Sequence, residues 1–240
     1  MHSWVVAIGI KNSTEWSYGS LISDNAVLTS AAVVANVHES DLTVMRECKI
    51  LSLPIVPMEL CDKRKVSNIK KFQNDIVILI LNLSFNLKKM INIAKDLHDI
   101  DKKNCLFMQW DFINMRDSTV QNAIINSYKV FFLEDEFNIA KLIHNRLRNQ
   151  DIEYAISNVT AILLQEQDGH NATIDMSREF LGNPLICTLK SNQSTYVQIG
   201  VAAGYLMLPR SNDFKLILGR YYVDVVEERL KITAFIERNR

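Results

Sequence analysis

The sequence predicts an all-β protein, and three observations support this fold class. Short apolar segments recur along the chain between polar loops, as in a β-barrel or a β-sandwich. With 240 residues, of which 48% are hydrophobic, the chain can bury one large core. No Pro/Gly-rich linker and no internal repeat marks a domain boundary. Because all-β barrels of this length commonly form a single domain, we expect one domain or two fused barrels.

The strand predictions rest on short runs of apolar or alternating residues between turn-forming loops. These runs are Trp4–Ile10, Gly19–Ile22, Ala26–Thr29, Asp75–Leu81, Lys129–Leu133, Thr160–Leu164, Leu185–Leu189 and Val197–Ala202.

Two segments predict helices instead. Phe137–Arg148 has apolar residues at helical spacing, and so does the C-terminal segment. In the C-terminal segment, the apolar stripe predicted to face the core consists of Val226, Leu230, Ala234 and Ile236. Packing against the core explains both stripes.

Charge and hydropathy exclude several kinds of partner. Twenty-seven basic residues balance 27 acidic ones, which removes the electrostatic argument for a nucleic-acid partner. The longest apolar run, Ile76–Leu81, is much too short to span a membrane. The four cysteines lack metal-ligand spacing, and we expect neither a metal nor a cofactor.

Four cysteines, Cys48, Cys61, Cys105 and Cys187, permit three pairings, and an even number suits a disulfide framework. Five Asn-x-Ser/Thr sequons are candidate glycosylation sites, although chance alone produces several in an Asn-rich chain. They begin at Asn12, Asn82, Asn158, Asn171 and Asn192. Residues 1–10 lack a basic start and do not resemble a signal peptide, so any leader is absent from this sequence.

Several separated segments in the first half resemble the chymotrypsin/trypsin family of serine proteases. Trp4–Ile8 resembles the early PW-V-A-I strand, and Gly19–Ile22 resembles the GGSLI segment. Ala26–Val33 is similar to WVLTAAHC, and Asn74–Leu79 is similar to NDIALL. They occur in the family's order at plausible distances.

The second half continues the resemblance over nearly the whole chain. Cys105 and Trp110 are similar to the C-x-V-x-G-W segment, Gly182–Cys187 to GGPLVC, and Gly200–Ala203 to GIVS. The family therefore implies two six-stranded antiparallel β-barrels with a short intermediate helix and a C-terminal helix, formed by residues 1–240 as one domain without the N-terminal activation segment. It also implies a Cys105–Cys187 disulfide, while Cys48 and Cys61 either form a second bridge or remain free thiols.

The resemblance also identifies which catalytic groups this chain lacks. Ala32 stands where LTAAHC places the histidine base, and Leu181 stands where GDSGGPL places the serine nucleophile. An alanine methyl group cannot accept a proton, and a leucine side chain has no heteroatom with which to attack a carbonyl. Asp75 matches the family's aspartate. The family predicts that Asp75 accepts backbone N–H groups from Ala31 and Ala32, because burying an unpaired carboxylate is costly.

The resemblance places a remnant of the specificity pocket at four positions. Asp175 falls where trypsin-like members keep the acidic residue at the base of the pocket. Ala203, Tyr205 and Gly219 fall along its walls and mouth, where Tyr205 replaces a small residue.

The resulting expectation is a protein without catalytic activity. It resembles the inactive serine protease homologues that animals, insects in particular, secrete into extracellular cascades. The expected partner is an extracellular protein such as a protease, a zymogen or an inhibitor. The alternative is a hydrolase with a rewired nucleophile, either Ser177 or Thr173 with His170 as the base.

Overall fold

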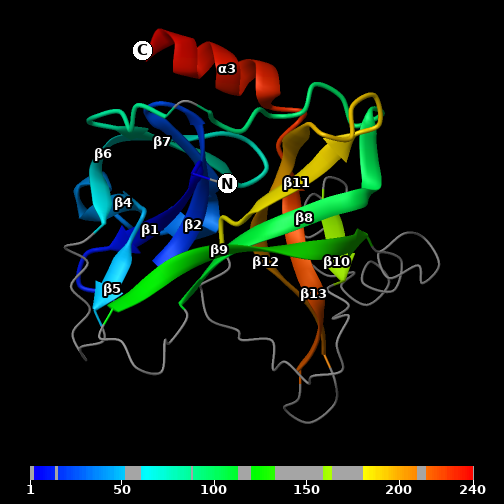
Figure 1. Ribbon diagram of the computed structural model, residues 1–240, viewed down its shortest axis with the longest axis horizontal. Coiled ribbons are helices and arrows are strands. Elements are labelled where there is room, and N and C mark those ends of the chain that lie inside the picture. The colour runs from blue at the N-terminus through cyan, green and yellow to red at the C-terminus, as the bar shows by residue number, and fades with distance from the viewer. Residues whose placement is uncertain are drawn as a thin grey trace.

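The computed structural model describes residues 3–13, 16–51, 61–87, 89–112, 120–132, 159–163, 181–209 and 215–239. In the first half of the chain, six strands form a closed antiparallel barrel in the order β1-β2-β3-β7-β6-β4 (Figure 1). These strands are β1 (Val5–Ile10), β2 (Trp16–Ser23), β3 (Ala26–Ser30), β4 (Leu42–Arg46), β6 (Asp62–Lys71) and β7 (Ile76–Leu81). Closure comes from β4, which pairs with β1 as well as with β6.

The β7 strand explains why the longest apolar run of the sequence is a strand. All six of its residues are buried. Val77, Leu79 and Leu81 contribute to the main hydrophobic core, whereas Ile76 and Ile78 belong to a second cluster on the other face of the strand. Because successive side chains point to opposite faces, a strand covered on both faces is apolar throughout.

The second half forms a seven-stranded sheet in the order β10-β13-β12-β11-β8-β9-β5. Its strands are β5 (Lys49–Leu51), β8 (Ile100–Phe112), β9 (Val120–Phe132), β10 (Val159–Leu163), β11 (Pro184–Leu189), β12 (Tyr196–Pro209) and β13 (Lys215–Asp224). An additional pairing of β9 with β10 joins the ends of the six strands from β8 onward into a ring. The short β5 strand comes from the first half of the chain and pairs with the beginning of β9.

The prediction identified eight of these strands and missed β4, β5, β6, β8 and β13. The β6 strand shows why, since its sequence is mostly charged and only Val66 is buried. It is held as a strand by hydrogen bonds to its two neighbours, β4 and β7, which no local pattern reveals.

The C-terminal helix α3 (Arg229–Arg238) lies across one end of the molecule, at the top of Figure 1. Its buried residues are Ile232 and Ile236, while Leu230 is 69% exposed and Ala234 also faces solvent. The predicted stripe was therefore wrong at Leu230 and Ala234 and right at Ile236. The predicted helix over residues 137–148 lies outside the described residues.

Ile232 and Ile236 belong to the same buried cluster as Ile76 and Ile78 of β7 and Val223 of β13. The tertiary contact with both halves of the chain therefore decides which face of α3 is buried.

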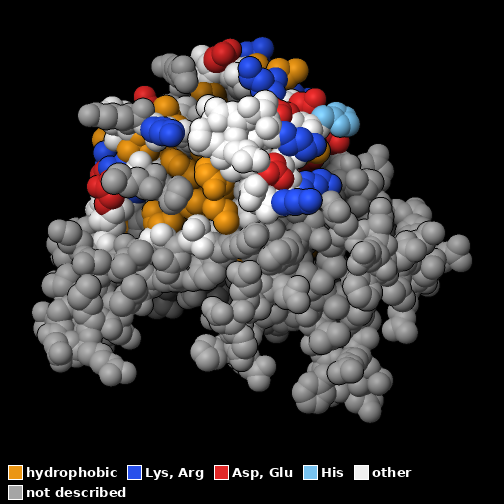
Figure 2. Space-filling view, turned by 45° about the vertical axis from the view of Figure 1, so that its right-hand side comes forward, with side chains coloured by type: hydrophobic (Ala, Val, Ile, Leu, Met, Phe, Trp, Pro, Cys, Tyr) orange, Lys and Arg blue, Asp and Glu red, His pale blue; other side chains and the backbone are white. Residues whose placement is uncertain are grey.

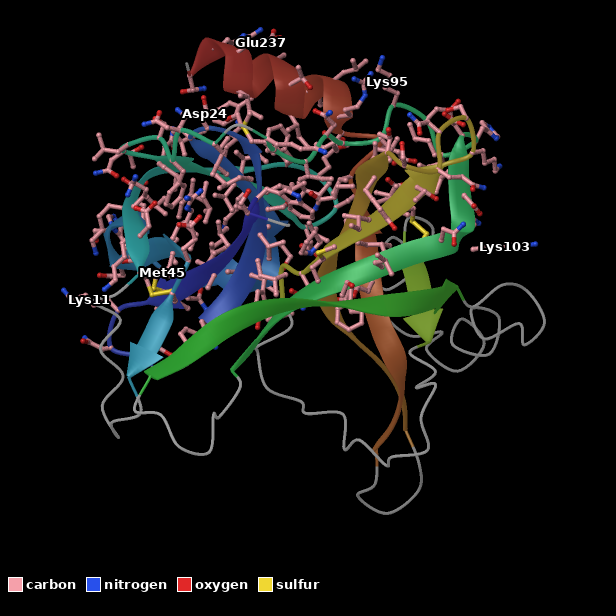
Figure 3. All side chains as sticks on the ribbon, in the orientation of Figure 1. Lys11, Asp24, Met45, Lys95, Lys103 and Glu237 are labelled. Carbon is pink, nitrogen blue, oxygen red and sulfur yellow. A yellow bond between two sulfur atoms is a disulfide. The ribbon has the colours of Figure 1, made fainter. Side chains whose placement is uncertain are left out.

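Both disulfides are present, Cys105–Cys187 and Cys48–Cys61, so no cysteine is free. The first was implied by the family resemblance, and the second resolves the alternative left open by the sequence. Figure 3 shows the Cys48–Cys61 bridge close to Met45 in the first barrel. Within the described part of the chain, no helix has the length and hydropathy needed to cross a membrane.

Candidate functional site at the junction of the two halves

Ala32 lies in a short 3₁₀ helix, η1 (Ala31–Val34), which follows directly on β3. Val33 and Val34 are buried, and Ala32 is partly buried against the main core. The main chain of this turn is fixed by a 2.7 Å hydrogen bond from the N–H of Ala31 to the backbone carbonyl of Asp75. Ala32, where the family resemblance places the histidine, is thus held beside the start of β7, but its side chain is only a methyl group.

Leu181 is fixed where the two halves of the chain meet. The N–H of Tyr18 in β2 donates to the carbonyl of Leu181 at 2.8 Å, and the N–H of Gly182 donates to Ala202 in β12 at 2.8 Å. The side chain of Leu181 is only 8% exposed and belongs to the same hydrophobic core that Ala32 contacts. The segment is therefore attached to both halves of the molecule, and its side chain packs in the core.

Gly182 shows how closely the two halves approach. Its φ is +80°, and a Cβ at this position would lie 1.9 Å from the carbonyl oxygen of Tyr18 and 2.3 Å from Oγ1 of Thr29. Only glycine fits both the left-handed backbone and the space. The GNPL sequence therefore keeps the glycine that the junction requires.

Asp75 differs from the prediction. Its side chain is exposed, its φ is +57°, and the N–H of Ala31 donates to its main-chain carbonyl. The predicted burial of the carboxylate and its anchoring by Ala31 and Ala32 were wrong. An exposed carboxylate keeps its hydration and therefore needs no buried donors.

Tyr221 of β13 is a residue of this region that the sequence analysis did not single out. Burial raises the pKa of its phenol, and the negative charge of Asp75 raises it further. Tyr221 is paired with Gly204 of β12, and its ring is so close that a Cβ on Gly204 would lie 2.3 Å from Cε1. A register shift between Ala202 and Gly204 produces this pairing, and no sequence motif signals such a shift.

The remnant specificity pocket remains a prediction. Ala203 is buried, and Leu206 of β12 is paired with Gly219 of β13, so Tyr205 and Gly219 lie on neighbouring strands. Asp175 lies outside the described residues, as do Ser177, Thr173 and His170 of the rewired alternative.

His38 is exposed before the 3₁₀ turn η2 (Glu39–Asp41), where its Nδ1 accepts the N–H of Ser40 at 3.3 Å. This contact caps a turn and is not directed to Asp75. Within the described ranges, no three His, Cys, Asp or Glu residues gather as metal ligands.

Three candidate glycosylation sites, Asn12, Asn82 and Asn192, are exposed. Asn192 lies in the connection between β11 and β12, where its Oδ1 accepts hydrogen bonds from Ser194 of its own sequon. Asn158 and Asn171 lie outside the described residues.

Among solved structures, the chain is similar to the crystal structure of scabies mite inactivated protease paralogue S-D1. The TM-score is 0.65 and the sequence identity is 15%, over 98% of this chain and 92% of that chain. No protein-family model matches the sequence, and no curated protein matches it either.

At this identity, the similarity establishes the fold alone. The chain has a trypsin-like fold, with a closed six-stranded antiparallel barrel, a second antiparallel sheet and a C-terminal helix. The fold-class prediction is thereby confirmed.

Proposed function

We propose that this chain is a non-catalytic serine protease homologue, a single domain that acts by binding an extracellular protein in a protease cascade. The observation that carries the proposal is the nature of two side chains at the junction. Ala32 and Leu181 both pack against the hydrophobic core, so neither position offers a base or a nucleophile. The trypsin-like solved structure is titled an inactivated protease paralogue, which is consistent with this proposal.

Secretion is the second part of the proposal. Two disulfides favour an oxidising compartment, because cytosolic proteins rarely keep structural disulfides. The exposed Asn12, Asn82 and Asn192 would be available to the glycosylation machinery. The described face in Figure 2 carries basic and acidic side chains interspersed, which favours a protein partner over a polyanion.

An active-site serine probe tests the absence of catalysis. We expect no labelling of the native protein by a fluorophosphonate, under conditions in which active trypsin is labelled stoichiometrically. Heat-denatured protein provides the background for non-specific reaction.

Stoichiometric labelling of the native chain would contradict the proposal. Its loss in Ser177→Ala or in Thr173→Ala would then identify a rewired hydrolase and its nucleophile.

A further inference from the structure

The two disulfides differ in exposure. Cys105 and Cys187 are both 0% exposed and lie directly opposite each other on β8 and β11. Cys48 is 3% exposed, but its partner Cys61 is partly exposed, so this bridge reaches the surface at Cys61. Because a thiolate must reach a sulfur atom to reduce a disulfide, the Cys48–Cys61 bridge is the more accessible of the two.

The Cys48–Cys61 bridge lies where the chain leaves the first barrel for the second sheet. Cys48 directly precedes β5, and Cys61 directly precedes β6. The bridge therefore ties the start of β5 to the start of a barrel strand. The β5 strand lies beside the beginning of β9 (Figure 1) and is the strand through which the first half of the chain enters the second sheet.

The pairing of β5 is short. Its three residues, Lys49–Leu51, pair with residues 120–122 of β9. In the part of the chain that the structure describes, β5 is the last strand of its sheet and pairs with no other strand. A three-residue pairing at a sheet edge contributes little stability of its own, so the covalent tie at Cys48 is what keeps β5 in place.

The barrel strands next to the bridge have other contacts. Four register pairs join β4 to β6. The carboxylate of Asp62 forms ion pairs with Arg46, at 3.3 Å, and with Arg64. Both guanidinium groups also lie over the ring of Phe85, at 5.4 Å for Arg46 and 4.5 Å for Arg64. The contact between β4 and β6 therefore does not depend on the disulfide.

We infer that the Cys48–Cys61 disulfide is a redox-sensitive latch, whose reduction by a dithiol releases β5 from β9 while the barrel and the Cys105–Cys187 bridge stay intact. The reductant is a small dithiol or the dithiol of an oxidoreductase. The inference goes beyond the proposed function, since it concerns control of the fold by redox state and not the choice of partner.

The reduction proceeds by two thiol–disulfide exchanges. One thiolate of the reductant attacks the sulfur of Cys61, the S–S bond breaks, and Cys48 leaves as a thiolate that takes up a proton. The second thiolate of the reductant then attacks the mixed disulfide and displaces the sulfur of Cys61, which is protonated in turn. The protein bridge gains two electrons and two protons, and the reductant becomes a disulfide.

The first test measures which bridge is reduced. The native protein is incubated for a fixed time with graded concentrations of dithiothreitol, quenched with acid, unfolded and labelled with N-ethylmaleimide. Peptide mass spectrometry then reports each cysteine. We expect Cys48 and Cys61 to be labelled at a dithiothreitol concentration about tenfold or more lower than Cys105 and Cys187. In denaturant, where burial is lost, this difference should disappear.

The second test measures what the reduction releases, by hydrogen exchange. In protein reduced only at Cys48 and Cys61, the amides of residues 49–51 and 120–122 should exchange faster, because the edge pairing opens. The amides of β4 and β6 should keep their protection. The Cys48→Ala/Cys61→Ala variant is the matched control, since its β5 should exchange at the fast rate with and without dithiothreitol. The unaltered protein decides the question even where this variant does not fold.

Reduction of Cys105–Cys187 at the same dithiothreitol concentration, or at a lower one, would overturn the inference. Unchanged exchange at β5 after reduction of Cys48–Cys61 would do so as well. If β4 and β6 lost their protection together with β5, the bridge would be a brace of the whole barrel and not a latch.

Discussion

Tyr221 of β13 has a raised pKa, and the titration of its phenol can be measured. Burial is the larger cause of the raised pKa of Tyr221, and the charge of Asp75 adds to it. The unfolded phenol loses its proton at a pH of about 10. Because the folded phenol keeps its proton to a higher pH, the native state binds more protons in that window. The contribution of the neutral Tyr221 phenol to the stability of the fold is present below about pH 10 and is lost as pH rises through the folded pKa.

Asp75→Asn should move the titration of Tyr221 to lower pH, since it removes the repelling charge but not the burial. The titration is followed in the ultraviolet absorbance of the phenolate, as a difference from the same protein carrying Tyr221→Phe. Asp24→Asn, another exposed aspartate, should have no effect on it. An unchanged titration in Asp75→Asn would show that the charge of Asp75 does not affect the pKa of Tyr221.

At the scale of elements, helix α3 attaches to the strands of both halves through Ile232 and Ile236. Ile232→Ala should lower the free energy of unfolding by about 2–5 kcal/mol, because it opens a cavity between α3 and the strands. Denaturant unfolding measures this change. Leu230→Ala, at the exposed neighbouring leucine, should change it by less than about 0.5 kcal/mol. A larger loss of unfolding free energy for Leu230→Ala than for Ile232→Ala would mean that another face of the helix is buried.

At the scale of the whole molecule, the two halves share one hydrophobic core. Val5 and Val6 of β1 belong to the same cluster as Leu185 and Ile186 of β11 and Tyr222 of β13. Each of the two disulfides closes a loop in the unfolded chain, and the two loops differ greatly in length.

Cys105–Cys187 spans 82 residues and Cys48–Cys61 spans 13. In the chain-entropy model, removing the disulfide that closes the longer loop lowers the free energy of unfolding by about 1.6 kcal/mol more than removing the other disulfide. The comparison is between the two double Cys→Ala variants, each unfolded in denaturant against the unaltered protein. An equal or larger loss for the Cys48/Cys61 variant would contradict an entropic origin.

The sequence by itself predicted the fold class, and its resemblance to the serine protease family implied the Cys105–Cys187 pairing and the candidate positions Ala32, Asp75 and Leu181. These features depend on short motifs such as Gly182–Cys187, whose residues lie together in the chain. Apolar runs such as Ile76–Leu81 were predicted for the same reason, because a strand that is buried on both faces is apolar at every consecutive position.

Only the tertiary structure decided which face of α3 is buried, where Asp75 points and what Tyr221 contacts. It also formed the groove between α3 and residues 91–99, which combines residues of β2, that segment, β12 and α3. These features depend on strand register, on a bulge near Gly204 and on segments far apart in the chain. Since side-chain burial is set by the partner surface rather than by local spacing, no pattern within one segment contains that information.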